Sequence, residues 1–359
     1  MEFRVSPAPF QRGKRTTLQI MLELSAVLLV VLGVSIAFHF IKGGIDLGVK
    51  AIIIVVTSLL TGLLTDVACA LIFKKFKIKE ILDYVLHSYT YVTALIFAMT
   101  LTAGTSVYAV IVGMVFATVL GKVIFGGFGQ NVVNPAAIGR AFVGLSFGAL
   151  VSTVPGVSGT VDIVTGGTVT SSINWITGAI PSGFTIKDLF FGNYIGALGE
   201  TFSFILIPAG IYLMVRKIID YRICLSYVLS VFVMTFILGF VLKVSFPLTY
   251  AVTHLVAGGL LFGAVFMLTD PVTSPTSQLG KIIFGIGAAF FTVLIRVFGS
   301  LPEGVVFSIL LMNLITPIIS NFVKGQTHTN LVKKYAVIAV LFVVCLAILC
   351  GISLIKVGV

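Results

Sequence analysis

A polar loop in a largely apolar chain holds the first residues that could do chemistry. Between residues 152 and 185, 18 of the 34 residues are Ser, Thr or Gly, and loops of this length are usually functional or disordered. Its centre reads Asp162-Ile-Val-Thr165-Gly166-Gly167-Thr168. Two glycines before a threonine let a bulky group approach the backbone and leave the hydroxyl accessible, and the aspartate can orient that hydroxyl or hold a metal ion. The loop is a candidate site of covalent modification; a merely solvated loop is the alternative.

A second segment combines glycines and polar side chains next to apolar runs. It extends from Phe125 to Arg140 and contains Gly126, Gly127, Gly129, Gln130, Asn131 and Asn134. Polar groups inside a membrane are costly and need partners. Asparagine amides offer paired donors and acceptors that suit the edge of a heteroaromatic ring, whereas interhelical hydrogen bonding explains the same residues without a ligand. Both interpretations stay open.

Carboxylates within or beside apolar runs are the third group. Intramembrane carboxylates are functional candidates by default, and the candidates for an ion path are Glu23, Asp66, Asp270 and Glu303. Capping of a helix N-terminus is the alternative for Glu303. No catalytic residue and no metal site is predicted, because the four cysteines lie singly in apolar runs and are expected to be small core residues (Cys69, Cys224, Cys345 and Cys350).

The elements that must position these residues are transmembrane helices. Of 359 residues, 58% are hydrophobic and 10% charged, and the mean hydropathy is +1.17; a soluble domain has about 25% charged residues. A soluble enzyme, a nucleic-acid binder and a disulfide scaffold are excluded. The chain is predicted to be an all-α polytopic membrane protein with about 10–11 spans, whose cores are 18–41, 49–73, 84–103, 106–125, 134–151, 194–215, 223–243, 249–268, 281–298, 303–321 and 335–355. Glycine and proline interruptions predict that some spans are broken or half-helices.

Basic residues predict the orientation of these spans. Lys and Arg cluster in the N-terminal tail and in the loops after the second, sixth and tenth spans, which all lie on one side of the membrane. The positive-inside rule then puts the N-terminus in the cytoplasm and residues 152–192 outside.

The two halves of the chain show a weak internal similarity. Met99-Thr-Leu-Thr followed by Gly121-Lys-Val-Ile-Phe-Gly126 parallels Met267-Leu-Thr-Asp followed by Gly280-Lys-Ile-Ile-Phe-Gly285. Asn134-Pro135 has a looser counterpart in Asn313 and Pro317. Repeats with interrupted helices at matching places are typical of transport folds with a site at the repeat interface.

Several motifs in order resemble one family, the D subunit of the Rnf ion-translocating ferredoxin:NAD oxidoreductase, a paralogue of the B subunit of the sodium-pumping NADH:quinone reductase. The resemblance covers about residues 3–322. The motifs are Ser6-Pro-Ala-Pro with Thr16-Thr-Leu-Gln-Ile-Met-Leu, the Gly-Gly-Phe-Gly-Gln-Asn-Val-Val-Asn-Pro-Ala run, Gly192-Asn with Gly199-Glu-Thr, Thr269-Asp-Pro-Val-Thr-Ser-Pro, and Pro302-Glu-Gly with Met312-Asn and Thr316-Pro.

The resemblance implies a flavoprotein. It implies covalent FMN on Thr168 through a phosphoester made by a flavin transferase, with Asp162, Thr165, Gly166 and Gly167 as the attachment motif. Gly167 is a departure, because the family usually has Ala there. Trp175, the only tryptophan, is a candidate to stack on the flavin or to anchor at the membrane interface. The resemblance further implies a non-covalent riboflavin or other second flavin, for which Gly126, Gly127, Gly129, Asn131 and Asn134 are the candidates.

The resemblance also implies a place in a larger complex and a division of the chain. The expected function is electron relay coupled to Na⁺ or H⁺ export in a bacterial or archaeal plasma membrane. Expected partners are the A, B, C, E and G subunits of Rnf, with ferredoxin and NAD reached indirectly, membrane lipid, and no nucleic acid. The expected segments are a cytoplasmic basic tail (1–17), a first transmembrane half (18–151), an extracytoplasmic flavin loop (152–192), a second transmembrane half (193–322), and a cytoplasmic linker with an extra helix (323–359).

Two alternatives stay open. One is the B subunit of the quinone reductase, which shares the flavin site but differs in electron acceptor. The other is a flavin-free channel or transporter for a small solute such as urea, because the family's bundle resembles urea transporters. The stretch from Thr165 to Thr168 distinguishes a flavoprotein from a channel, since a channel has no use for a flavin attachment motif.

Overall fold

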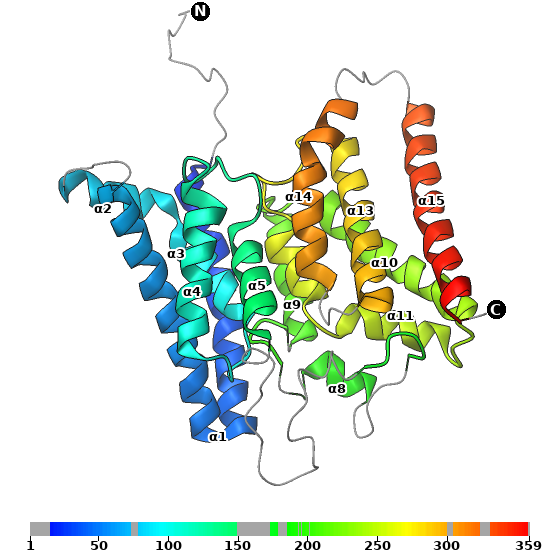
Figure 1. Ribbon diagram of the computed structural model, residues 1–359, viewed down its shortest axis with the longest axis horizontal. Coiled ribbons are helices and arrows are strands. Elements are labelled where there is room, and N and C mark those ends of the chain that lie inside the picture. The colour runs from blue at the N-terminus through cyan, green and yellow to red at the C-terminus, as the bar shows by residue number, and fades with distance from the viewer. Residues whose placement is uncertain are drawn as a thin grey trace, which may run out of the picture.

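The computed structural model describes residues 15–72, 78–148, 173–178, 185–192, 194, 196–200, 202–299, 304–323 and 331–357 (Figure 1). Within these ranges the chain folds into helices without a strand, and an isolated bridge joins Thr102 to Ala197. The prediction of an all-α polytopic membrane protein is confirmed. By length and composition, five of the described helices can each cross a membrane, or seven if each bent pair is one span.

The first half begins with a helix that is broken near its middle. α1 (Thr17–Ile72) has 56 residues, and Gly44 inside it adopts φ 74°, outside helical geometry. A straight helix of that length would be about 84 Å long, whereas the hydrocarbon layer is about 30 Å thick. Figure 1 shows α1 turning back at the bottom of the view, so that it supplies the first two predicted spans. The remaining helices of this half are α2 (Ile78–Ser88), α3 (Thr90–Met99), α4 (Val107–Thr118) with the π-helical turn η1 (Val119–Val123), and α5 (Pro135–Ser146).

The second half follows a short helix, α8 (Ile186–Phe191). Its elements are α9 (Ser203–Val215), α10 (Tyr221–Val241), α11 (Pro247–Val256), α12 (Leu260–Phe262) with the π-helical turn η2 (Gly263–Met267), α13 (Gln278–Phe298) and α14 (Gly304–Phe322). A last helix, α15 (Leu331–Val357), packs against α10 and α13 (Figure 1).

Two bent helix pairs and two short helices confirm the prediction of interrupted spans. α2 and α3 meet at 43°, and α11 meets the α12–η2 segment at 59°. α5 and α9 have 12 and 13 residues, or roughly 20 Å at 1.5 Å per residue. Each is therefore too short to cross the hydrocarbon alone. α9 follows an irregular segment whose described residues are buried in the bundle.

The two bent pairs are held in the same way in opposite halves. Lys122, at the end of η1, donates to the carbonyl oxygen of Ser88 at the α2–α3 break. Arg296, near the end of α13, donates to the carbonyl oxygen of His254 close to the α11–α12 break, at 2.6 Å. These contacts make η1 and the end of α13 structural counterparts.

The counterparts lie on opposite faces of the bundle. Lys122 lines a cavity together with Ile20 near the start of α1, on what we call the N-terminal face. Arg296, near the end of α13, lies beside Trp175, and Figure 1 shows α13 ending at the bottom of the view, near α11 and α8, whereas α1 begins at the top. The second half is therefore inverted relative to the first.

This arrangement corrects part of the predicted internal repeat. The parallel between Met99-Thr-Leu-Thr and Met267-Leu-Thr-Asp holds, because both stretches end a bent pair. The parallel between Gly121-Lys122 and Gly280-Lys281 is wrong: the first pair ends its helix and the second begins one, on the same face. Short Gly-Lys-aliphatic stretches recur at membrane borders for reasons of composition, without a shared place in the fold.

Candidate functional site

A cavity of about 110 Å³ lies on the N-terminal face, between the two halves. The first half contributes the start of α1, the α2–α3 break, Lys122 and the segment that precedes α5. The second half contributes residues 218–219 and the loop after η2. A site at the interface of inverted repeats is the general arrangement of transport folds with broken helices. The aromatic side chains of its wall are Tyr89, Phe128 and Phe266, and its polar side chains are Thr93, Lys122, Asn131, Asn134, Thr269 and Asp270.

The two asparagines of the cavity differ in how many of their hydrogen-bonding groups are free to bind a ligand. The Asn134 Oδ1 accepts from the backbone N–H groups of Ala136 and Ala137, at 3.0 and 3.3 Å, and so caps α5. Its Nδ2 donates to the carbonyl oxygen of Met267 at 3.0 Å, which ties α5 to η2. Asn134 thus holds the two halves together. Among the described residues, the Asn131 Nδ2 makes only long contacts, 3.4 Å to the carbonyl of Val133 and 3.5 Å to Asp270, so Asn131 is the amide that a ligand can engage.

The predicted glycines shape the loop that carries Asn131. Gly126, Gly127 and Gly129 have φ values of 117°, 107° and 85°, a region that L side chains rarely adopt and glycine enters freely. The three glycines let the chain turn sharply between η1 and α5. None of the three lines the cavity, and the turn that they permit brings Asn131 to it.

Asp270 forms a turn at the edge of the cavity. Its Oδ1 accepts from the backbone N–H of Val272 at 3.2 Å, and its Oδ2 accepts from the Thr273 hydroxyl at 3.3 Å. Burial raises the pKa of this carboxyl above its usual range, against the opposing effect of those hydrogen bonds. Asp270 therefore shares the cavity with Lys122 while its carboxylate already organises the loop before α13.

Lys122 is a functional candidate that the sequence did not single out. Its side chain is 2% exposed, and its ammonium donates to Ser88 O and to the Thr90 hydroxyl at the helix break. The Ser88 hydroxyl in turn donates to Asp66 Oδ2 at 2.5 Å. The signal available in the sequence was a lysine inside an apolar run, just before a run of glycines, but such a lysine resembles those that set the orientation of the neighbouring loops.

A second buried polar cluster lies on the opposite face. The Arg296 guanidinium lies 4.8 Å from the centre of the Trp175 ring, and the His254 ring is 4.6 Å from that indole. The Tyr250 hydroxyl donates to Trp175 O at 2.6 Å. Trp175 is 9% exposed, so the single tryptophan is a core residue, and it lies within the predicted flavin loop (152–192). Glu200 is buried on this face next to Gly259.

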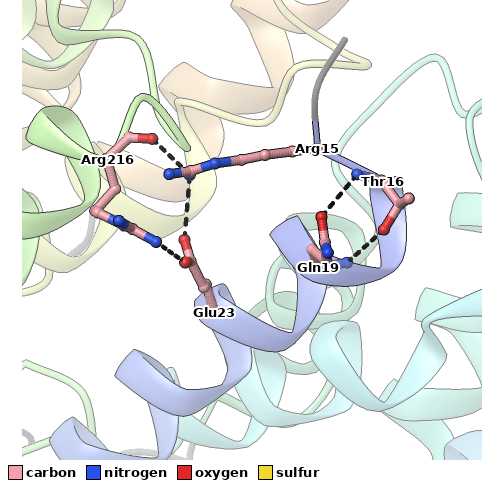
Figure 2. Close-up of polar contacts among 5 residues, drawn as sticks. All are labelled: Arg15, Thr16, Gln19, Glu23 and Arg216. Atoms are coloured by element: carbon pink, nitrogen blue, oxygen red, sulfur yellow. Dashed lines mark hydrogen bonds and ion pairs between the residues drawn. The ribbon is translucent and has the colours of Figure 1, made fainter. Parts of the chain in front are cut away.

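Glu23 joins the two halves at the N-terminal face (Figure 2). Its carboxylate lies 3.3 Å from the Arg15 guanidinium and also pairs with Arg216, which follows α9. Arg15 donates to the carbonyl oxygen of Arg216 at 2.9 Å, and Thr16 and Gln19 bond reciprocally to start α1. The structure thus gives this predicted ion-path residue two cationic partners that link α1 to α9.

The other predicted residues divide into described and undescribed ones. Asp66 is wholly buried in α1. Asp162, Thr165, Gly166, Gly167, Thr168 and Glu303 lie outside the described residues. Cys69, Cys224 and Cys345 are buried and Cys350 is half-buried, all with free thiols, as expected for small core residues. Among the described residues, no three or more His, Cys, Asp or Glu side chains are grouped so that they could hold a metal ion.

The fold and the cavity together define a polytopic helical membrane protein with inverted halves and a polar site between them. A sequence profile of the NQR2, RnfD, RnfE family matches residues 4–329, and the chain belongs to this family. The predicted resemblance is thereby confirmed.

Individual relatives agree with the family. The chain is 31% identical over 344 residues to the D subunit of the Na(+)-translocating ferredoxin:NAD(+) oxidoreductase complex of Acetobacterium woodii, covering 94% of this chain and 98% of that one. It is 32% identical over 290 residues to the D subunit of the proton-translocating ferredoxin:NAD(+) oxidoreductase complex of Clostridium ljungdahlii, covering 79% and 85%. It is 36% identical over 251 residues to the B subunit of the Na(+)-translocating NADH-quinone reductase of Azotobacter vinelandii, covering 68% and 61%.

Proposed function

We propose that this chain is the flavin-bearing D subunit of an Rnf-type ferredoxin:NAD⁺ oxidoreductase in a bacterial or archaeal plasma membrane. In this complex, electron flow drives export of Na⁺ or H⁺. The chain matches the two Rnf relatives over 98% and 85% of their length but spans only 61% of the quinone-reductase relative. This difference in coverage favours the Rnf subunit over the quinone-reductase subunit. The partners that we propose are the A, B, C, E and G subunits of Rnf, through which ferredoxin and NAD are reached.

Thr168 is proposed to take FMN through a phosphoester, with Asp162, Thr165, Gly166 and Gly167 as the motif read by a flavin transferase. Trp175, seven residues further along the chain, supports this proposal, because Tyr250 and Arg296 hold it on the face opposite the start of α1. With the N-terminus in the cytoplasm, as the basic loops predict, the attachment site would be extracytoplasmic.

The cavity on the N-terminal face is proposed to bind a second, non-covalent flavin. The observation that carries this proposal is the grouping of Asn131, Lys122 and Asp270 around a cavity with aromatic walls. Amide, ammonium and carboxylate groups match the alternating donors and acceptors along the polar edge of a flavin ring, and the aromatic side chains suit its faces. When bound, a flavin supplies one- and two-electron chemistry, while the residues of the chain fix its position and its electrostatic environment.

One experiment tests both flavins. The full chain is expressed with a flavin transferase and denatured, and flavin is measured as in-gel fluorescence and as extractable flavin. We expect Thr168→Ala to abolish the fluorescent band and Thr170→Ala, its matched control, to keep it. Asn131→Ala should lower the extractable flavin and leave the covalent band unchanged.

A dark wild-type band would refute the covalent flavin and direct attention to Gly167. If the wild type also released no extractable flavin, the flavoprotein proposal would fail as a whole. Measured flux of a small solute such as urea would then support the channel alternative.

A further inference from the structure

The break between α2 and α3 gathers four oxygen-bearing groups in the interior of the first half. α2 ends at Ser88, Tyr89 turns the chain with φ 52°, and α3 begins at Thr90. Ser88 contributes its carbonyl and its hydroxyl, Thr90 contributes a hydroxyl 3.3 Å from that of Ser88, and Asp66 contributes a carboxylate from α1. Asp66, Ser88 and Thr90 are each at most 2% exposed.

These oxygens have the chemistry of a cation site. Hard cations take carboxylate, carbonyl and hydroxyl oxygens as ligands, and the C-terminal ends of broken helices supply carbonyls to Na⁺ or H⁺ in transport proteins. A second observation points the same way. Asp66 Oδ1 is buried and has no hydrogen-bond partner among the described residues, although a buried carboxylate oxygen without a partner is costly.

A cation already occupies part of this cluster, because the Lys122 ammonium donates to Ser88 O and to Thr90 Oγ1. We propose that Asp66, Ser88 and Thr90 form a monovalent cation site and that Lys122 fills it as a tethered cation in this conformation. The site carries one formal negative charge, which matches Na⁺ better than a divalent ion.

The equivalent contact in the second half shows why Lys122 can leave. Arg296 donates to His254 O as Lys122 donates to Ser88 O, but its guanidinium also packs on the Trp175 ring. A planar guanidinium on an aromatic ring is fixed, whereas an ammonium on a four-carbon stem is a mobile point charge. In the second half, Arg296 is a permanent structural cation. In the first half, Lys122 is a cation that Na⁺ can replace.

Lys122 also lines the cavity that contains Asn131 and Asp270. Negative charge added to the cavity would draw the ammonium toward it and leave the oxygen atoms of the site to Na⁺. This second step rests on the proposed flavin in the cavity, but the cation site itself does not. The cation site is therefore tested by itself, without reference to flavin content.

The test uses the full chain in detergent and its thermal unfolding midpoint. Lys122→Met removes the tethered cation and keeps an apolar stem. We expect the midpoint of this variant to rise by several degrees in NaCl over choline chloride at matched ionic strength, because a ligand of the folded state stabilises by mass action. The wild type should show a smaller difference. Lys281→Met is the control, since it removes a lysine of the same face that pairs with Asp220 at 2.7 Å; its midpoint should not distinguish Na⁺ from choline.

A second variant covers the case in which Lys122→Met does not fold in choline. Asp66→Asn combined with Lys122→Met removes both charges and should fold without any dependence on Na⁺. Recovery of the single variant in NaCl alone supports the site.

Three results would overturn the Na⁺ site. In the first, the single variant has the same midpoint in both salts. In the second, it is recovered in neither salt while the double variant folds. In the third, it is stabilised by acid alone, which indicates protonation of Asp66. If the double variant also fails to fold in both salts, the cluster is structural and the proposal is rejected. Flavin content enters none of these criteria, so a failure here is distinct from a failure of the proposed function.

Discussion

At the scale of single residues, charges outside the spans connect helices at the N-terminal face. Asp220 lies between α9 and α10, accepts from the backbone N–H of Arg222 at 2.9 Å, and pairs with Lys281 of α13 at 2.7 Å. Burial alone raises the pKa of Asp220, but the hydrogen bond from Lys281, the backbone N–H of Arg222 and the two positive charges outweigh it and lower the pKa below its usual range. The ionised form of Asp220 is therefore stabilised more in the folded protein than in the unfolded chain.

Asp220→Asn should destabilise the protein in a pH-dependent way. Asparagine caps helices about as well as aspartate, so the substitution isolates the charge. We expect a loss of up to about 1 kcal/mol at neutral pH. Because the folded pKa is depressed, the stabilisation is complete above the unfolded pKa of about 3.9 and is lost as the pH falls through the folded pKa. Thermal midpoints of both proteins between pH 7 and pH 3 check this; a constant difference down to the lowest pH would contradict it.

The sequence identified some residues of the cavity and missed others for a physical reason. Asn131 and Asp270 stand out because amides and carboxylates are costly at membrane depth. Lys122 does not, because its partners Ser88 and Thr90 precede it by more than 30 residues and meet it only through the α2–α3 break. Asn134 has the same residue type as Asn131, and only its contacts show that the fold uses it fully.

At the scale of elements, α4 and α5 pack through glycine. A Cβ atom added to Gly139 would lie 2.8 Å from Ala117 Cβ and 2.9 Å from the carbonyl oxygen of Gly113. Close backbone approach through small residues is a principal means of helix packing in membranes. Because Asn134 at the start of α5 lines the cavity, this packing also positions the cavity.

Gly139→Ala should therefore force α5 away from α4 and destabilise the protein by about 1–3 kcal/mol. Gly144→Ala in the same helix is the control. A Cβ there would meet only Arg140 Nη1, at 3.5 Å, and alanine is the better helix former by up to about 1 kcal/mol. Thermal unfolding compares the two variants. Equal midpoints for both variants would show that close contact between α4 and α5 at Gly139 does not determine the stability of the protein.

Hydropathy predicts that an element exists better than it predicts where the helix begins. All eleven predicted apolar runs contain a helix or a bent pair. The run at 194–215 begins before α9, because apolar residues extend back into an irregular segment that is buried in the protein. The run at 134–151 extends past Ser146, the last residue of α5. The segment before α9 bonds through its backbone to the end of α3, with Leu198 N–H donating to Leu101 O at 3.0 Å. Such a long-range pairing leaves no local pattern in the sequence.

At the scale of the whole molecule, the inverted halves form one unit and α15 is an addition to it. The family profile ends at residue 329, before α15 begins. Only 17% of the apolar window of α15 is buried, against 50% for α10 and for α13. Its polar link to the bundle is Lys356, whose ammonium donates to the carbonyl oxygen of Phe298 at 3.1 Å at the end of α13. The cavity is lined entirely by residues of the two halves.

A chain that stops after residue 330 should therefore keep its flavins and its fold. We expect unchanged covalent and extractable flavin and a thermal midpoint that falls by only a few degrees, because one lipid-facing helix packs on α10 and α13 from outside. The fall has two causes, loss of the hydrogen bond to Phe298 and loss of the packing of α15. Lys356→Met separates them, because it removes the hydrogen bond and keeps the helix. Its midpoint should lie between those of the wild type and the truncated chain. Loss of extractable flavin on truncation would contradict this division of the molecule. It would show that α15 is needed to maintain the cavity, although no residue of α15 lines it.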